Sequence, residues 1–229
     1  MTAALARLRD VDVVLTTTRA VRRRLDFDRP VPRETLLECL ELALQAPTGG
    51  NAQDWRFVVV GDPAVRTAVG ALYRQCFERY VREPLAAGLD APAARGRLDT
   101  SAAVERMLAG AAYLAENIGR APWLVLACAT RPNPEREPEA AGTAAAVYGS
   151  VFPAVWSFCL ALRSRGLGSI ITTLHLNRER DLGALLSVPD GVTQCCLVPV
   201  AYTLGEDFRP APRRPLEEVV YWDRWGARA

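Results

Sequence analysis

Short, unbroken apolar runs punctuate the chain and predict the strands of a buried sheet. The runs Trp55–Val60, "WRFVVV", and Trp123–Ala129, "WLVLACA", are compact and bounded by turn-forming residues. A third run, Thr193–Tyr202, is longer, and the stretch "GLGSIITT" turns into a short strand. We expect the run Trp123–Ala129 to form a buried strand.

Apolar residues at helical spacing predict helices between these strands. In "RPVPRETLLECLELALQAP", leucine and alanine recur every three or four positions until Pro47 ends the pattern. From Thr143 to Arg165 one apolar stripe marks a long core helix. The remaining helices are expected through about Leu15, from the "GDP" turn to roughly Tyr80, over Ala102–Ile118 and over Arg178–Ser187.

Alternating strands and helices indicate a mixed α/β chain, which we expect to form one domain over residues 1–229. No GxGxxG follows a strand and no GxxxxGK[ST] occurs, so neither common phosphate-binding loop is supported. Residues 83–100 and 131–141 have the Pro-, Gly- and Arg-rich composition of mobile lid or surface loops. The tail, residues 206–229, has too few partners in its own chain to fold alone.

Composition excludes several classes of protein. The formal net charge of +2 argues against a nucleic-acid binder with a broad basic face. The N-terminus lacks the core of a signal peptide, and no apolar run approaches the length of a membrane span, so we expect a cytoplasmic protein without a membrane partner. Six cysteines without CxxC spacing fit a reducing compartment. His175 is the only histidine, and we expect neither a histidine metal cluster nor a Ser/His/Asp triad around it.

The loop "APTGGNAQDW" carries two side-chain amides and a hydroxyl directly before a strand. Asn51 and Gln53 could cap local turns, as such residues commonly do. Alternatively, their amides, with the Thr48 hydroxyl, could bind the polar edges or ribityl hydroxyls of a planar cofactor.

Arginine is the only long cationic side chain available, since the chain has no lysine. It gathers in "TTRAVRRRL", which holds Arg19, Arg22 and Arg23, and in "APRRPLEEV", which holds Arg213 and Arg214. Each cluster alone reads as a solvated basic face. Together they could converge on a phosphate, which arginine binds in a bidentate manner, if the fold brings the first and last segments together.

The ordered motifs resemble the FMN-dependent nitroreductase family. In that family an Arg-rich "RRSxR" segment precedes a helix ending in "APSxxNxQPW" and then a strand. Here "RAVRRRLDFDRPVPRETLLECLELALQAPTGGNAQDWRFVVV" follows the same plan, and "RGLGSIITT", "LLSVPDG", "LVPVAY" and "RRPLEEVVYWD" follow in order. Ala20 stands where many members have Ser, and Asp54 replaces the usual Pro.

The resemblance implies an α+β nitroreductase-like fold, with a central, mostly antiparallel sheet flanked by helices. It also implies a homodimer with FMN at the subunit interfaces and a domain-swapped C-terminal tail, residues 206–229, that wraps the partner. By the same resemblance the phosphate would be bound by the opening and closing arginines, and the flavin by the amide loop and a strand end. The implied cofactor-binding residues are Arg19, Arg22, Arg23, Thr48, Asn51, Gln53, Ile171, Thr172, Thr173, Arg213 and Arg214.

The activity implied is hydride transfer from NAD(P)H to FMN, followed by electron transfer to a small electron-poor acceptor such as a nitroaromatic or a quinone. No catalytic side chain is assigned, because solvent can supply the proton. The titratable candidates are Tyr73, Tyr80, Tyr113, Tyr148 and His175, each of which also reads as an ordinary structural residue. Two alternatives are a flavin-sequestering protein with little turnover and a specialised relative that dehalogenates, cleaves flavin or oxidises a heterocycle.

Overall fold

The computed structural model describes residues 11–83, 101–131, 140–205 and 207–227. The chain divides into two compact units, Arg19–Glu206 and a smaller one formed by Met1–Thr18 with Asp207–Ala229. The expected loops at 83–100 and 131–141 fall almost wholly outside the described residues.

A five-stranded antiparallel sheet forms the centre of the larger unit. Its strands are β1 (Leu25–Asp26), β2 (Trp55–Val60), β3 (Trp123–Ala129), β4 (Leu167–Ser169) and β5 (Thr193–Thr203). The order is β1-β5-β3-β2, and β4 pairs with β5 as well. Every strand pair in the sheet is antiparallel, which confirms the α+β class.

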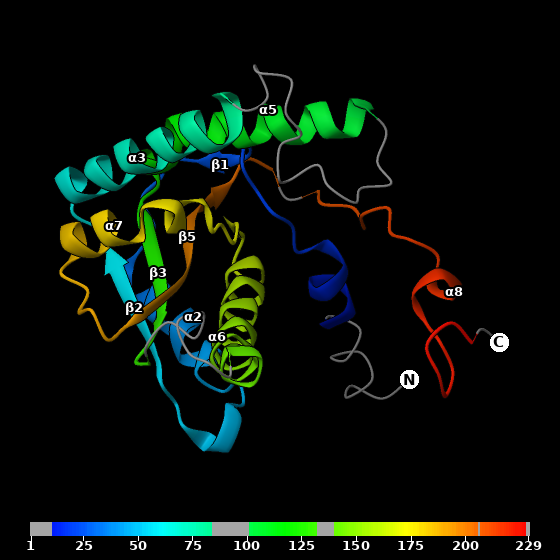
Figure 1. Ribbon diagram of the computed structural model, residues 1–229. Coiled ribbons are helices and arrows are strands. Elements are labelled where there is room, and N and C mark those ends of the chain that lie inside the picture. Colours follow the sequence, from blue (N-terminus) through cyan, green and yellow to red (C-terminus); the bar gives the residue numbers. More distant parts are fainter. Residues whose placement is uncertain (1–10, 84–100, 132–139, 206, 228–229) are drawn as a thin grey trace. The chain divides into compact units, whose positions relative to one another are not determined.

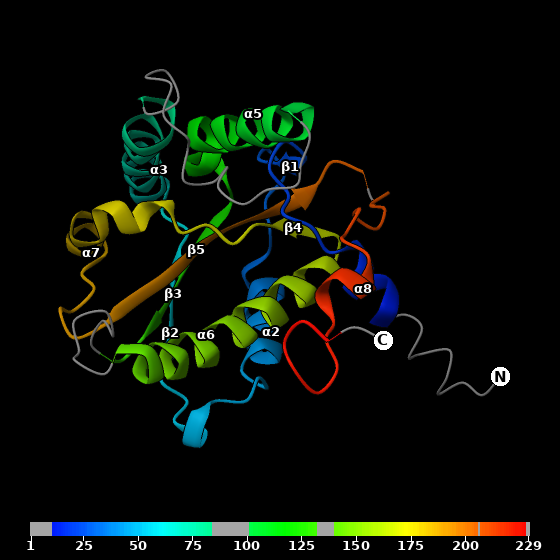
Figure 2. The same ribbon diagram turned by 45° about the vertical axis from the view of Figure 1, so that its right-hand side comes forward.

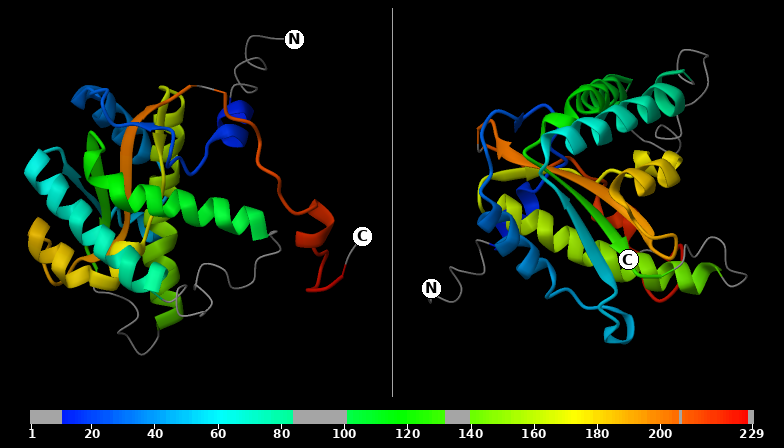
Figure 3. Two further views of the ribbon diagram at one scale, coloured as in Figure 1. Left: turned by 90° about the horizontal axis from the view of Figure 1, so that it is seen from above. Right: turned by 90° about the vertical axis from the view of Figure 1, so that its left-hand side faces the viewer.

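Helices cover both faces of this sheet (Figure 1 and the right view of Figure 3). On one face lie α2 (Arg33–Ala43) and α6 (Ala140–Arg163), which pack against each other. On the other lie α3 (Pro63–Phe77), α5 (Ser101–Asn117) and α7 (Glu179–Leu186), with α3 in contact with both of the others (Figure 2). The shorter helical turns are η1 (Gly49–Asn51), η2 (Glu78–Arg82), η4 (Ile118–Arg120) and η6 (Leu174–Arg178).

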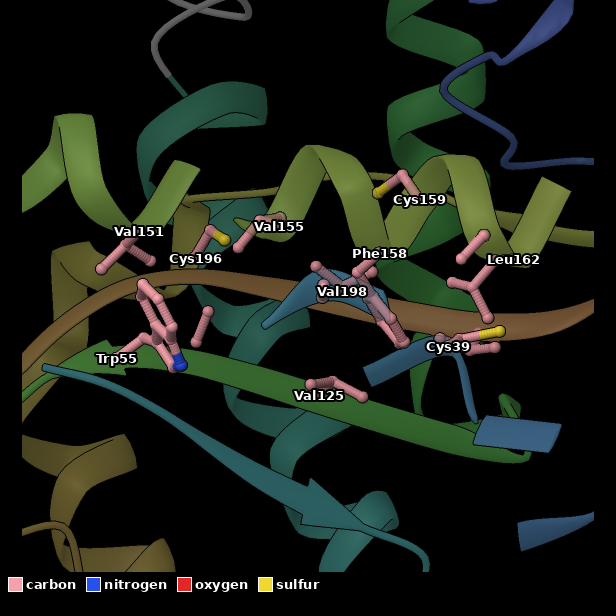
Figure 4. Close-up of a cluster of buried hydrophobic side chains, with 14 of the residues drawn as sticks. Cys39, Trp55, Val125, Val151, Val155, Phe158, Cys159, Leu162, Cys196 and Val198 are labelled. Atoms are coloured by element: carbon pink, nitrogen blue, oxygen red, sulfur yellow. The ribbon is translucent and has the colours of Figure 1, made fainter. Parts of the chain in front are cut away.

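Side chains of α6 fill the core between that helix and the sheet. Val155, Phe158 and Leu162 are at most 1% exposed and point toward β3 and β5 (Figure 4). Trp55, at the start of β2, and Cys39 of α2 belong to the same cluster. The periodicity of the sequence is therefore explained by burial, because the stripe of α6 is the face that covers the sheet.

The structure corrects two sequence-based predictions, one about α6 and one about the end of α2. The span Ala141–Arg163 is long and apolar enough to cross a membrane by length and composition, so the statement that no run approaches that length was wrong. Half of that apolar window is buried against the rest of the chain, as in the core helix of a soluble protein. In addition, α2 ends at Ala43, a turn before Pro47.

The smaller unit is described by itself. Residues 11–17 are helical, and the hydroxyl of Thr17 donates to the carbonyl of Val13 over 2.6 Å. The tail contains the short helix α8 (Leu216–Val219) and a turn in which the rings of Tyr221 and Trp225 lie 4.8 Å apart.

Candidate functional site

The opening arginine segment adds to the outer edge of β4. Ala20 forms a parallel bridge with Ser169, and the Val21 N–H donates to the Ser169 carbonyl over 2.9 Å. This pairing brings the segment that carries Arg19 and Arg22 alongside the chain that continues toward Thr172. Two of the predicted segments, separated by about 150 residues in sequence, therefore meet at one sheet edge.

After β4 the chain still pairs with β5, through Thr172 and Leu197. This pairing determines which backbone N–H and C=O groups point away from β5. Thr172 pairs with Leu197, donating its N–H over 3.0 Å and accepting from the Leu197 N–H over 2.8 Å. Successive residues of an extended chain point their backbone groups to opposite sides, so Ile171 and Thr173 share the outward direction of the Ser169 carbonyl. Among the described residues, neither the Ile171 nor the Thr173 N–H has an acceptor.

This pattern refines the prediction for the strand end. Ile171, Thr172 and Thr173 were expected to present backbone to a flavin as one group. The backbone of Thr172 is instead committed to Leu197, while the side chain of Thr172 contacts the α3 layer. The N–H groups available at this edge are those of Ile171 and Thr173.

Arg22, from the opening segment, extends toward α5 and acts on Tyr73, the residue that contacts Thr172. A Cβ on Gly110 of α5 would lie 3.3 Å from Arg22 Cδ, so the glycine leaves room for the arginine chain. Arg22 also acts electrostatically on Tyr73 of α3, where it favours the ionised phenol. Arg19 is half-buried beside the bridge, whereas Arg23 is exposed.

The phenol of Tyr73 connects α3 to this edge. Its oxygen lies 2.7 Å from Thr172 Oγ1, and the residue is 4% exposed. Burial raises the pKa of Tyr73 above its ordinary value, while the hydrogen bond to Thr172 and the charge of Arg22 oppose that rise. The phenol is therefore neutral near pH 7 and keeps its proton. The sequence offered Tyr73 only as one of several possible acids, because its partner is 99 residues away.

The amide loop is built as a strained, internally bonded turn. Gly50, Asn51 and Gln53 have positive φ angles of 60°, 53° and 49°. The Gln53 amide donates to Asn51 Oδ1 over 3.0 Å, and the Gln53 N–H donates to Thr48 Oγ1 over 3.1 Å. Two non-glycine residues in the left-handed region are uncommon, and such conformations gather at functional loops.

Two further side chains hold this loop to the body. The Gly49 N–H donates to Oγ of Ser150 on α6 over 3.2 Å. Arg56 donates to the carbonyls of Gln53 and Trp55 over 3.2 and 2.7 Å. Thr48 thus has a structural role, while Asn51 and Gln53 are exposed at the tip. Arg56 belongs to the loop and not to the two terminal arginine clusters.

Asp54 anchors the base of the loop through an ion pair that the sequence did not indicate. Its Oδ2 lies 2.5 Å from Nε of Arg131, and its side chain is 9% exposed. The carbonyl of Asp54 accepts from the Thr130 N–H over 2.8 Å, which ties β2 to the end of β3. The proline typical of this position has no charge and could not form this ion pair. The carboxylate that Asp54 introduces in its place is neutralised locally by Arg131.

The loop and the arginine segment lie at opposite ends of the sheet. Trp55, directly after the loop, pairs with Ala129, which pairs with Thr193 at the start of β5. Ser169, beside the arginine segment, pairs with Val200. The seven steps along β5 from Thr193 to Val200 correspond to roughly 23 Å at about 3.3 Å per residue. In Figure 1 the turn after α2 and strand β1 are correspondingly far apart.

Arg213 and Arg214 belong to the smaller unit. Both are exposed, and Arg213 donates to the carbonyl of Pro212 over 3.1 Å. Their convergence with Arg19 and Arg22 stays a prediction.

His175 is the remaining titratable candidate. It is 1% exposed, and neither ring nitrogen has a hydrogen-bond partner among the described residues. Burial lowers its pKa to about 4, so the ring is neutral near pH 7. No group of three metal-ligating residues occurs in the described ranges.

Comparisons with known proteins agree with this architecture. The model of the Nitroreductase family matches residues 15–202. An NADH dehydrogenase of Thermus thermophilus is 31% identical, over 93% of this chain and 96% of its own. An iodotyrosine deiodinase of Thermotoga neapolitana is 31% identical, over 90% and 94%. A crystal structure of oxidised iodotyrosine deiodinase bound to FMN and 3-iodo-L-tyrosine is 25% identical, covers 93% and 98%, and has a TM-score of 0.64.

Proposed function

The chain belongs to the nitroreductase family of oxidoreductases, and from that premise we propose that it binds FMN, oxidises NAD(P)H and passes the electrons to a small electron-poor acceptor. The observation that carries the proposal is the sheet edge at which the arginine segment meets the outward N–H groups of Ile171 and Thr173. Guanidinium groups and free backbone donors side by side suit a ligand with a phosphate at one end and a polar ring edge at the other.

The donor set of this chain fits FMN by its chemistry. Arg19 and Arg22 would hold the phosphate, with Arg23 as a third candidate, because guanidinium binds phosphate oxygens in a bidentate manner and keeps its charge. The Ile171 and Thr173 N–H groups would face the ring edge. When bound, the flavin supplies the redox chemistry, and the protein positions it and excludes competing reactions.

Asn51 and Gln53 would complete the site from a second copy of the chain. The strained tip of the amide loop is roughly 23 Å along the sheet from the sheet edge of its own chain that carries the arginine segment, here called the arginine edge. Side chains of both segments therefore cannot surround one small cofactor within a subunit. In a homodimer, the amide loop of each chain could reach the arginine edge of its partner. Both segments would then contribute to one cofactor site.

The outer face of α6 supports such a dimer. The span Ala141–Arg163 is strongly apolar, yet only half of its most apolar stretch is buried. Trp156, on that outer face, is 42% exposed. An apolar helix face of this kind suits association with another protein surface. The tail of residues 206–229, with Arg213 and Arg214, would wrap the partner in the same assembly.

A second candidate acceptor is a halogenated aromatic compound. The deiodinase of Thermotoga neapolitana and the NADH dehydrogenase of Thermus thermophilus are equally similar to this chain, at 31% identity. The similarity to the deiodinase supports the dehalogenating alternative, which the sequence motifs alone did not support. It leaves nitroaromatics and quinones as the general class, since an open flavin face accepts flat electrophiles.

The remaining proposals concern the cell and the electron donor. All six cysteines are buried free thiols, which fits a reducing cytoplasm. The proposal includes both NADH and NADPH as electron donors. A protein that merely stores flavin is the rival reading, and it has no need to react with either nucleotide.

The test is an anaerobic turnover assay on protein loaded with FMN. NADH and NADPH are each supplied with a nitroaromatic, a quinone or 3-iodo-L-tyrosine. We expect nucleotide oxidation that depends on the acceptor. Release of iodide would select the dehalogenating alternative, and FMN binding without turnover of any acceptor would support the storage protein instead.

A further inference from the structure

Tyr73 connects α3 to the strand end that lies beside the arginine segment. Its ring extends from α3, where it is 4% exposed, and its hydroxyl contacts Thr172 over 2.7 Å. Arg22 acts on the same phenol from the opening segment and runs past Gly110 of α5. One buried side chain thus contacts the strand end and feels the charge of the arginine that we assign to the phosphate.

The hydrogen bond between the Tyr73 and Thr172 hydroxyls uses the one polar group of Thr172 that is not bonded to Leu197. Both backbone groups of Thr172 are bonded to Leu197. Its side chain is β-branched, so few χ1 rotamers are open to it. A partner 2.7 Å from Oγ1 selects among these rotamers and also directs the hydroxyl proton. The position of Thr172 is therefore determined from two sides, by Leu197 and by Tyr73.

The neighbours of Thr172 are the residues with outward N–H groups. Ile171 and Thr173 have no backbone bond to β5 of their own, so their positions follow from that of Thr172. A displacement of Thr172 would therefore also displace the Ile171 and Thr173 N–H groups. Small displacements of positioning groups are costly to catalysis.

We propose that Tyr73 is a positioning residue for the flavin edge, fixing Thr172 and thereby the Ile171 and Thr173 N–H groups relative to Arg22. It touches neither the cofactor nor the acceptor in this account, and so it is not a catalytic residue. The inference rests on the proposed FMN site. The alternative is that Tyr73 is an ordinary core tyrosine and that its hydrogen bond to Thr172 has no effect on the flavin.

A double-mutant cycle separates these views. The variants are Tyr73→Phe, Thr172→Val and the combination of both, with Thr172→Ser as the conservative substitution that keeps the hydroxyl. Tyr113→Phe is the matched control, because Tyr113 lies on α5 and its ring packs on Phe27 at 6.4 Å between centroids. For each variant we would measure the FMN dissociation constant, the midpoint potential of bound FMN and the rate of its reduction by NADH.

We expect Tyr73→Phe to slow flavin reduction about three- to tenfold and to shift the midpoint potential, with Thr172→Val giving a similar change. The double variant should be no worse than Thr172→Val alone, because the two residues act through one hydrogen bond. Thr172→Ser should behave like the wild type. Tyr113→Phe should leave the rate and the potential unchanged.

Three results would overturn the inference. These are a Tyr73→Phe protein indistinguishable from Tyr113→Phe, a fully additive double variant, or a loss in Tyr73→Phe explained by unfolding in a thermal melt. If the wild-type protein binds FMN normally, each of these results rejects the role of Tyr73 alone. A wild-type protein that does not bind FMN would reject the proposed function and this inference together.

Discussion

The backbone N–H of Val21 donates to the carbonyl of Ser169 over 2.9 Å, and this bond joins the arginine segment to the strand end. The pairing explains why arginines near residue 20 and threonines near residue 172 can serve one ligand. It also places the segment of the proposed phosphate ligands Arg19 and Arg22 at the same sheet edge as the outward N–H groups of Ile171 and Thr173.

The first prediction concerns the phosphate. Arg22→Ala should weaken FMN binding about ten- to hundredfold, because hydrogen bonds to charged groups contribute about 1.5–3 kcal/mol. Arg19→Ala should act in the same direction. Fluorescence titration of the apoprotein with FMN measures the loss. Arg180→Ala, an exposed arginine on α7, is the control and should bind FMN like the wild type.

The second prediction concerns the composite site. Subunits carrying Arg22→Ala are mixed with subunits carrying both Asn51→Ala and Gln53→Ala, and the heterodimer is isolated with two affinity tags. If each site combines the arginine edge of one subunit with the loop of the other, one of the two sites is intact. The heterodimer should then bind half the wild-type amount of FMN. Binding no stronger than that of either mutant homodimer would mean that the loop and the arginines of one chain serve the same site.

The third prediction concerns the dimer. Trp156→Glu should convert the protein to monomers, because it places a charge on the apolar outer face of α6. Light scattering coupled to gel filtration measures the mass. Leu185→Glu, on the opposite side of the sheet, is 39% exposed in the wild type and should remain dimeric. A dimeric Trp156→Glu protein would exclude this face from the interface.

The fourth prediction concerns His175 and pH. Burial holds its pKa at about 4, below the 6.5 of the unfolded chain. The unfolded state therefore binds the proton first as the pH falls. The contribution of His175 to the free energy of unfolding is fully present above pH 6.5 and decreases by about 3 kcal/mol on the way to pH 4.

Urea denaturation at pH 7 and at pH 4.5 measures this effect. His175→Leu should lose the histidine component of the decrease, and it should be at least as stable as the wild type at pH 7, since no described group bonds the ring. An equal decrease in both proteins would assign the pH dependence to other groups.

Much of the fold could be predicted from local pattern alone. The bounds of β2 and β3 agree with the apolar runs Trp55–Val60 and Trp123–Ala129 to the residue, because turn-forming residues bound each run, although β3 is buried inside the sheet and β2 lies at its edge. The two-residue strand β1 was missed, since Leu25–Asp26 has no strand pattern of its own and pairs only with the distant end of β5.

The site was less predictable because its contacts join remote segments. The amide loop could be singled out, as Gly, Asn and Gln cluster before a strand. The pairing of Asp54 with Arg131 and of Tyr73 with Thr172 could not, because nothing in either local sequence indicates the partner. The commitment of the Thr172 backbone to Leu197 is likewise a product of sheet register.

The central claim is that this chain uses bound flavin to accept electrons from a nicotinamide nucleotide. The most direct test is the absorbance spectrum of the purified, desalted protein before and after anaerobic addition of NADPH and then NADH. The account predicts a yellow protein whose flavin bands bleach with at least one donor. A colourless protein that fails to take up added FMN, or a yellow one that neither donor bleaches, would contradict it.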